Sequence, residues 1–407
     1  MPQCNQMDLQ TGCLHWPRVD GPPLRLGVLA ADAACDVALI GGGITGALVA
    51  YHLSAAGVSV VVLERRDVCS GSTPASTGLL QYEIDKPLTE LAKMLGQSRA
   101  ARAYGASQAS LAAYRQLVAE LDDGCGLIAR PSVYLACEPD DVDELAAEAA
   151  ARNEIGIDCE LLSAEGLKAR VGIDRPAAIW SPAAYEVDPQ RLCLSLMRAA
   201  IRQGARAFAR TQAAAYEASA TGVAIATDCG PIVRARRVVF ATGYETPEFL
   251  GDCRCTLKST YALTGHPVPD ALHAWPHRCL VWESGHPYFY ARTTPDGRPM
   301  IGGEDEPSAD PAARDALIPA KAEALTAKFH QLFPAIPLRP DCCWAGTFAE
   351  TPDGLPYIGE HPAFPLGLFA LGYGGNGITF SLIAARILTD AVLGRANGDA
   401  ALFGFAR

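Results

Sequence analysis

The 407-residue sequence lacks any apolar run that approaches the ~20 residues of a membrane-spanning helix. Its longest apolar stretches, residues 37–40 and 58–63, have the length of a strand and end in glycine or in a charged residue. Residues 1–21 contain neither an apolar run nor a cluster of positive charge, which disfavours a signal peptide. These features predict a cytoplasmic protein without an integral membrane segment.

Positive charge is also scarce, since 34 Lys and Arg face 45 Asp and Glu for a formal net charge of −11. No basic cluster interrupts this balance, which argues against nucleic acid or an anionic membrane as a partner. The 14 cysteines contain no C-x-x-C pair, and no histidine pair has metal-ligand spacing. The only cysteines close to one another in sequence are Cys253 with Cys255 and Cys342 with Cys343. We therefore expect no metal site, and we expect the cysteines to be reduced structural thiols.

One complete β-α-β unit opens the organised part of the chain. Residues 36–40 read as a buried strand, residues 44–56 as a helix, and residues 58–63 as the next strand, with Glu64 at its tip. Residues 88–121 form an alanine-rich helical pattern. A chain of this length is expected to divide into two packed domains, so the sequence predicts an α/β protein with a second domain.

The turn between the first strand and its helix reads Gly41-Gly-Gly43-Ile-Thr-Gly46 and fits G-x-G-x-x-G. Its glycines permit a tight turn, close approach of a pyrophosphate, and close packing of helix on strand. The helix N-terminus offers free N–H groups to phosphates. Glu64, 23 residues after Gly41, is placed to accept hydrogen bonds from ribose hydroxyls. The turn therefore predicts dinucleotide binding.

Four further segments resemble the D-amino acid oxidase family of FAD enzymes. They are residues 64–77, the Val-Asp-Pro-x-x-Leu helix start at 187–192, Phe240-Ala-Thr-Gly243, and the glycine-rich turn at 372–379. The resemblance covers about residues 35 to 395 in the family's order, and no second dinucleotide turn indicates a nicotinamide domain. It implies a Rossmann-like FAD-binding domain interleaved with an α+β substrate domain that contains an antiparallel sheet.

The resemblance also implies domain limits and cofactor contacts. The FAD-binding domain is expected at 35–110, 186–250 and 338–407, the substrate domain at 111–185 and 251–337, and residues 1–34 as an arm over the surface. The hairpin at 288–303 has no Cys and the loop at 71–77 has no His, so FAD is expected to be noncovalent. The expected FAD-binding residues are Gly41, Gly43, Ile44, Thr45, Gly46, Glu64, Arg65, Gly71, Ser72, Thr73, Ser76, Thr77, Ala213, Ala241, Thr242, Gly243, Gly374, Gly375, Asn376, Gly377, Ile378 and Thr379.

Family members that oxidise amino acids hold the substrate carboxylate with Arg or Lys at three recurring places. Here those places carry Gln81, Phe348 and Thr379. A guanidinium is the usual partner of a carboxylate, so its absence favours an amine over a simple α-amino acid. The pattern around Gln81, Phe348 and Glu350 resembles the gamma-glutamylputrescine oxidase branch more than the glycine oxidase branch.

The expected substrate-site residues are Gln81, Lys258, Tyr290, Phe348 and Thr379. Tyr288, Tyr290 and Arg292 alternate along one strand, with Trp282 before it, and can line a pocket or form an ordinary core. Glu83 or Glu350 can bind a substrate ammonium or form a surface salt bridge.

The activity that the resemblance implies is hydride transfer from the carbon of a C–N bond to flavin N5, with O2 or an unknown compound as the final electron acceptor. Two alternatives stay open: a dehydrogenase that passes electrons to a quinone or a protein, and a flavin-binding protein without turnover that acts in assembly. The oligomeric state stays open as well.

Overall fold

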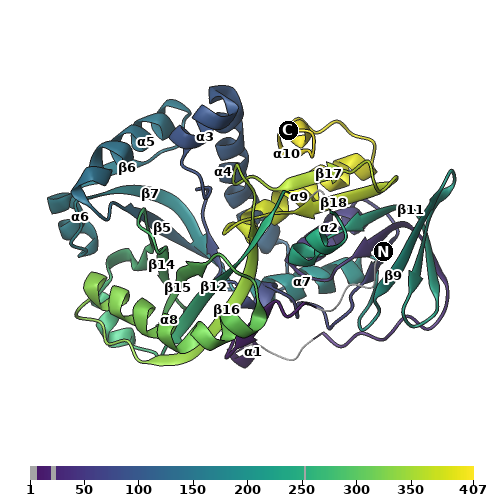
Figure 1. Ribbon diagram of the computed structural model, residues 1–407, viewed down its shortest axis with the longest axis horizontal. Helices are drawn as coiled ribbons and strands as arrows, with labels where there is room; N and C mark the ends of the chain where they lie inside the picture. Colours follow the sequence, from purple (N-terminus) through teal and green to yellow (C-terminus); the bar gives the residue numbers. More distant parts are fainter. Residues whose placement is uncertain (1–6, 20–23, 252–253) are drawn as a thin grey trace.

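Two β-sheets organise the computed structural model, which describes residues 7–19, 24–251 and 254–407. Figure 1 shows them in separate halves of an elongated molecule, with β5, β7, β12, β14, β15 and β16 in one half and β9, β11, β17 and β18 in the other. Residues 1–6 and 20–23 of the expected arm, and Cys253, lie outside the described residues. Within those residues, no helix combines the length and the apolar character that crossing a membrane requires.

The first sheet has the strand order β17-β18-β11-β2-β3-β8, and a β9–β10 extension continues from β11. Strands β18, β11, β2, β3 and β8 are mutually parallel, whereas β17 is antiparallel to β18. The strands are β2 Ala33–Ile40, β3 Val60–Leu63, β8 Arg206–Phe208, β9 Ala213–Ser219, β10 Gly222–Thr227, β11 Ile232–Phe240, β17 Tyr357–Glu360 and β18 Gly367–Leu371.

Both faces of this parallel sheet are covered, which explains its unbroken apolar strands. Val37 and Leu39 of β2 pack toward α2 Ile44–Ala55, α7 Pro189–Arg202 and α9 Gly377–Val392. Ala38 and Ile40 point the other way, into a core shared with β9 and β10. Asp188 caps α7 as expected, because its Oδ1 accepts the N–H groups of Gln190 and Arg191 at 3.0 and 2.9 Å.

The second sheet has the order β1-β16-β12-β15-β14-β13-β5-β7-β4, with β6 paired to β7. Most of its pairs are antiparallel, although β13 and β5 run parallel. Its strands are β1 Gln10–Gly12, β4 Leu79–Leu80, β5 Ile128–Leu135, β6 Glu160–Ser163, β7 Ala177–Glu186, β12 Thr256–Gly265, β13 Leu280–Glu283, β14 Phe289–Thr293, β15 Pro299–Glu306 and β16 Pro340–Glu350.

Alternation along β5 divides the two faces of this sheet. Val133 and Leu135 join a core with α6 Ala164–Val171 and α8 Pro311–Leu332. Tyr134 and Ala136 point to the opposite face, toward α5 Val142–Glu154 and the aromatic residues of β13 and β14. The remaining helices are α1 Trp16–Val19, α3 Leu88–Leu95, α4 Gln97–Ala119 and α10 Ala400–Phe403, and short 3₁₀ turns occupy Thr73–Ala75, Pro139–Asp141, Gly243–Glu248, Pro269–Ala274 and Pro276–Arg278.

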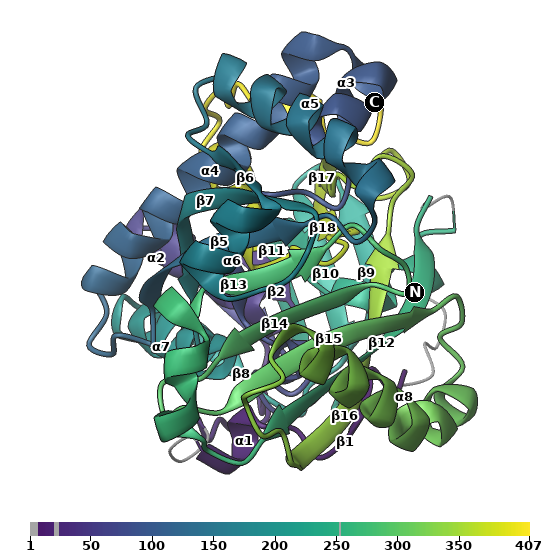
Figure 2. The ribbon, with the colours of Figure 1, turned by 90° about the vertical axis from the view of Figure 1, so that its left-hand side faces the viewer.

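Two expectations about local structure were wrong. The helix expected over residues 88–121 breaks at Gly96, whose φ of +85° cannot continue a helix, and becomes α3 and α4. The arm does not simply lie over the surface: β1 pairs with β16, as Figure 2 shows, and Trp16 of α1 is buried. The domain limits stay a prediction, although β16 at 340–350 is hydrogen-bonded into the second sheet.

Candidate active site

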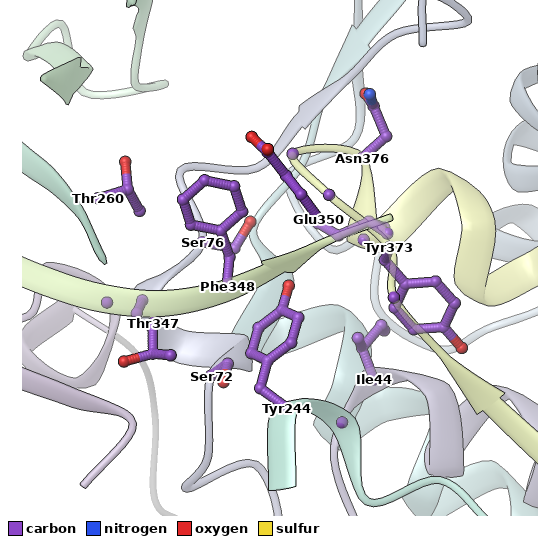
Figure 3. Close-up of a pocket in the computed structure, with 18 of the residues that line it drawn as sticks. Ile44, Ser72, Ser76, Tyr244, Thr260, Thr347, Phe348, Glu350, Tyr373 and Asn376 are labelled. Carbon is purple, nitrogen blue, oxygen red and sulfur yellow. The ribbon is translucent and has the colours of Figure 1, made fainter. Parts of the chain in front are cut away.

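A cavity of about 630 Å³ runs from the glycine turn at the parallel sheet to the aromatic face of the second sheet. This size lies within the ~300–1,000 Å³ of small-molecule and cofactor pockets. Figure 3 shows its wall in close-up, with Ile44 and Ser72 on one side and Thr260, Phe348 and Glu350 on another. Segments from both ends of the chain therefore meet around one space.

The glycine turn has the tight geometry that its sequence predicts. Gly41 has φ +108°, and a Cβ there would lie 2.3 Å from the carbonyl oxygen of Ala241. A Cβ on Gly46 would lie 2.0 Å from the carbonyl oxygen of Gly41, so this glycine lets α2 pack against the turn. Gly43 caps α2 without a side chain, which leaves the helix N-terminus open toward the cavity. This arrangement fits a pyrophosphate.

Glu64 stands at the tip of β3 with its carboxylate held in place. Its Oε2 accepts the N–H of Gly42 and its Oε1 accepts the N–H of Arg66, both at 2.7 Å. A carboxylate has about four acceptor positions, so two remain for ribose hydroxyls. Glu64 lines the cavity and is 9% exposed, and its role as the ribose-binding acid stays a prediction.

The loop at residues 71–77 lies beside the glycine turn and is fixed through its backbone carbonyls. Trp344 Nε1 donates to Ala75 O at 2.8 Å, and Trp16 Nε1 donates to Ser76 O at 2.7 Å. Arg292, which is fully buried, donates to the carbonyls of Thr77 and Gly78 at 3.0 and 2.8 Å. Arg292 thus supports the loop behind the cavity, a role that its place in the Tyr288–Arg292 alternation did not reveal.

The structure brings 20 of the 22 expected FAD-binding residues to the cavity wall. Gly46 lies behind the wall in α2, which suits its packing role. Thr379 is the other exception: its hydroxyl donates to the carbonyl of Gln81 at 3.1 Å and the residue is 1% exposed. The wall residues are Gly41, Gly43, Ile44, Thr45, Glu64, Arg65, Gly71, Ser72, Thr73, Ser76, Thr77, Ala213, Ala241, Thr242, Gly243, Gly374, Gly375, Asn376, Gly377 and Ile378.

Of the five expected substrate-site residues, Gln81, Tyr290 and Phe348 line the cavity. Gln81 Nε2 is buried and has no hydrogen-bond partner among the described residues. Thr379 and Lys258 are not among the residues that line the cavity, and their catalytic roles stay predictions. Thr379 is turned toward the backbone, and Lys258 Nζ lies 2.5 Å from Glu350 Oε2. Glu350 itself lines the cavity beside Phe348, on the same side of β16 (Figure 3).

Aromatic side chains form the far wall of the cavity. Tyr134 and Trp282 stack with ring centroids 3.8 Å apart, and the ring centroids of Tyr288 and Tyr290 lie 5.9 Å apart. Tyr290 lies over Gly302, where a Cβ would meet its hydroxyl at 2.2 Å. All four side chains line the cavity. For Trp282, Tyr288 and Tyr290 the sequence had left open whether they belong to a pocket or to an ordinary core.

Glu83 lines the cavity but forms no surface salt bridge. It is 3% exposed, and its Oε1 lies 3.3 Å from Nη1 of the fully buried Arg152. Burial raises the pKa of Glu83, and its Oε2 has no hydrogen-bond partner among the described residues.

The sequence did not indicate two acidic residues that line the cavity, Asp85 and Asp305. Asp85 accepts the N–H of Gly375 and the side-chain amide of Asn376, both at 2.9 Å. Asp85 is accessible from the cavity, and partial desolvation there, with the nearby carboxylates of Glu350 and Asp305, raises its pKa to about 6. Asp305 lies within the bulge between β12 and β15 and lines the cavity, and burial raises its pKa. The glycine pair at 302–303 inside a strand was the available signal.

No group of His, Cys, Asp and Glu within the described part of the chain is arranged to hold a metal ion.

Comparison with known proteins supplies the context for this site. Residues 36–391 match the family model described as DAO, FAD dependent oxidoreductase. The chain is 28% identical to a glycine oxidase of Bacillus licheniformis, over 88% of this chain and 93% of that protein. It is 24% identical to the gamma-glutamylputrescine oxidoreductase of Escherichia coli, over 91% and 86%. Overall identity thus does not favour the gamma-glutamylputrescine branch, which stays a prediction.

The fold agrees with this family. The crystal structure of glycine oxidase from Geobacillus kaustophilus superposes with a TM-score of 0.76 at 22% identity, covering 92% of this chain and 99% of that one. The match of the family model over most of the chain, together with the glycine turn, Glu64 and the loop at 71–77, makes this chain a member of the DAO family of FAD-dependent oxidoreductases, an enzyme whose cofactor is FAD.

Proposed function

We propose that this flavoenzyme oxidises the carbon–nitrogen bond of an amine that has no carboxylate beside the reacting carbon. The supporting observation is that, among the described residues, each Lys and Arg on the cavity wall already has an acidic partner. Arg65 and Arg66 contact Glu245, and Lys86 Nζ lies 2.9 Å from Glu90. A substrate carboxylate would have to displace one of these partners.

The wall offers negative charge instead. Asp85, Asp305 and Glu350 influence one another electrostatically, and Lys258 is the cation that all three share. Asp305 Oδ1 has no hydrogen-bond partner within the described structure. An aliphatic amine is an ammonium ion at neutral pH, because its pKa is near ~10. Such a cation is attracted to this wall, whereas an amino-acid carboxylate is repelled.

The bound ammonium must first lose a proton to water, so that the neutral amine reacts. Bound FAD would supply the acceptor for the hydride that leaves the substrate carbon, and water then hydrolyses the imine product. The side chains of this enzyme bind and orient the amine and keep water out while that step occurs. The stacked Tyr134 and Trp282, with Tyr288 and Tyr290, supply an apolar surface for the substrate's carbon chain. We also propose that FAD is held noncovalently, since no cysteine of the described chain lines the cavity.

Anaerobic mixing with butylamine, 1,4-diaminobutane, glycine and sarcosine tests this function. We expect the amines to bleach the flavin band near ~450 nm and the two amino acids to leave it unchanged. Reduction by glycine or sarcosine but not by the amines would contradict the proposal. If no compound reduces the flavin, the result would favour the alternative of a flavin-binding protein without turnover.

A charge-removing variant adds a second check. Glu350→Gln should raise the amine concentration needed for half-maximal reduction, while Glu217→Gln on the exposed strand β9 should not. The electron acceptor is settled separately: hydrogen peroxide formed in air identifies an oxidase, and turnover only with an added quinone identifies a dehydrogenase.

A further inference from the structure

The N-terminal arm segment, residues 7–19, forms part of the wall around FAD. Leu9 is buried and lines the cavity, and its carbonyl accepts the N–H of Thr347 at 2.9 Å. Strand β1 continues this contact by pairing Gln10 with Gly346 and Thr11 with Ala345. On the other side, Arg66 donates to the carbonyl of Met7 at 2.8 Å. The segment therefore spans from β16 to the residues beside Glu64.

Trp16 ties the same segment to the flavin loop at residues 71–77. Its indole is 2% exposed and donates to Ser76 O, and the guanidinium of Arg292 lies 5.6 Å from its ring centroid. Since Trp344 and Arg292 hold the neighbouring carbonyls, the arm completes a set of three donors behind the loop. Displacing the arm would release one of the three supports.

Two thiols meet where the arm segment leaves β16. The Sγ atoms of Cys13 and Cys342 lie 2.9 Å apart, although the residues are 329 positions apart in sequence. Cys13 is exposed and Cys342 is buried. Nη1 of Arg18 lies 2.6 Å from the sulfur of Cys342 and 3.5 Å from that of Cys13. The guanidinium of Arg18 favours the thiolate form of Cys342 and so opposes the effect of burial on that thiol.

We propose that Cys13 and Cys342 form a reversible disulfide that fastens the arm segment across the FAD site and retains the cofactor. The sulfur atoms need to approach by less than about 1 Å to reach the ~2.05 Å of a disulfide bond. The bond would close a loop of more than 300 residues, and a cross-link that closes a long loop restrains the unfolded chain most.

Hydrogen peroxide is the oxidant of this step. The Cys13 thiolate attacks one peroxide oxygen, so that an S–O bond forms, the O–O bond breaks, and hydroxide leaves and takes up a proton. The Cys342 sulfur then attacks the Cys13 sulfur, so that the S–S bond forms and the S–O bond breaks, releasing a second water. Cys13 is the exposed thiol of the pair and Cys342 is buried, so Cys13 meets the oxidant first.

Oxidation of the FAD-loaded protein with limiting hydrogen peroxide tests the pairing. Tandem mass spectrometry of the unreduced digest should show Cys13 joined to Cys342, and dithiothreitol should remove this product. Cys343 follows Cys342 directly and Cys13 donates its N–H to the Cys343 carbonyl at 2.8 Å, so a Cys343→Ser variant confirms the assignment. A bond from Cys13 to Cys343, or none to Cys13, would overturn the proposal.

The effect on the cofactor is read from the temperature at which free flavin fluorescence appears on heating. We expect this temperature to rise by several degrees on oxidation of the native protein and to fall back on reduction. Cys13→Ser should abolish the difference, whereas Cys229→Ser, which removes an exposed thiol elsewhere, should keep it. A Cys13–Cys342 bond that leaves the release temperature unchanged would refute the retaining role.

Trp16→Phe provides a measurement that does not depend on oxidation. It keeps a buried ring but removes the donor to Ser76 O, so FAD should be released at a lower temperature in both redox states while the shift between them persists. An unchanged release temperature would show that the arm does not support the flavin loop.

Discussion

The carboxylate of Asp85 accepts the backbone N–H of Gly375 at 2.9 Å and so joins the segment after the flavin loop to the turn before α9. Gly374 makes this contact sterically feasible, because a Cβ there would lie 2.0 Å from Asp85 Oδ2. The Gly375 amide is therefore occupied by Asp85, while Gly377 and Ile378 line the cavity.

Asp85 predicts a pH dependence of amine binding. Its pKa is raised from 3.8 to about 6, so the carboxylate is ionised above that pH and neutral below it. The apparent KM for an amine should therefore rise as the pH falls from 7 to 5. Asp85→Asn retains an oxygen that can accept the Gly375 N–H but removes the charge. We expect it to raise KM about 10- to 100-fold at pH 7, the size of one charged hydrogen bond, and to flatten the pH profile.

Steady-state or anaerobic reduction assays across pH measure this effect, with Asp122→Asn as a surface control. A profile in Asp85→Asn that keeps the step near pH 6 would assign the titration to another group, such as Asp305.

The parts of the site that sequence predicted are those encoded by neighbouring residues. The tight turn at Gly41 and Gly46 follows from a six-residue motif, and Glu64 follows from the end of the next strand. The alternation of Tyr288 and Tyr290 follows from strand geometry alone. In each case the physical constraint acts within one element or one β-α-β unit.

The parts that sequence did not predict join distant positions. Asp85 meets Gly375 across 290 residues, and Cys13 meets Cys342 across 329. Trp16 stands in a segment without periodicity, so its bond to Ser76 had no local signature. Thr379 and Lys258 do not line the cavity, because a motif position does not specify the side chain's direction, which here is set by the Gln81 carbonyl and by Glu350.

Glu64 should govern FAD affinity. Glu64→Ala removes both ribose acceptors and the two backbone contacts to Gly42 and Arg66. Loss of hydrogen bonds to a charged group costs about 1.5–3 kcal/mol, so we expect FAD to bind roughly 10- to 100-fold more weakly. Flavin fluorescence during reconstitution of the apoprotein measures the affinity, and Glu217→Ala on β9 serves as the control. Unchanged affinity would mean that the ribose lies elsewhere.

Noncovalent binding of FAD predicts that denaturation frees the cofactor. After precipitation with acid, the yellow colour should remain in the supernatant and the pellet should be colourless. Among the described residues, His286 is the one histidine on the cavity wall. Flavin retained in the pellet would therefore indicate His286 as the candidate attachment site. Mass spectrometry of the intact denatured protein gives an independent measurement, since covalent FAD would add its mass to the chain.

Gly46→Ala should destabilise the FAD-binding half of the enzyme. The added methyl group would lie 2.0 Å from the carbonyl oxygen of Gly41, and backbone on both sides leaves it little room to move. Overpacking of this kind costs about 1–3 kcal/mol, which lowers the melting temperature and the FAD content together. Gly105→Ala is the matched control, because Gly105 lies within α4 and a Cβ there meets nothing within 4 Å. Replacing a helical glycine by alanine under those conditions should stabilise the protein by about 0.5–1 kcal/mol. Calorimetry of the two variants should therefore shift the melting temperature in opposite directions, and a Gly46→Ala protein as stable as the native one would show that α2 can move away from the turn without loss.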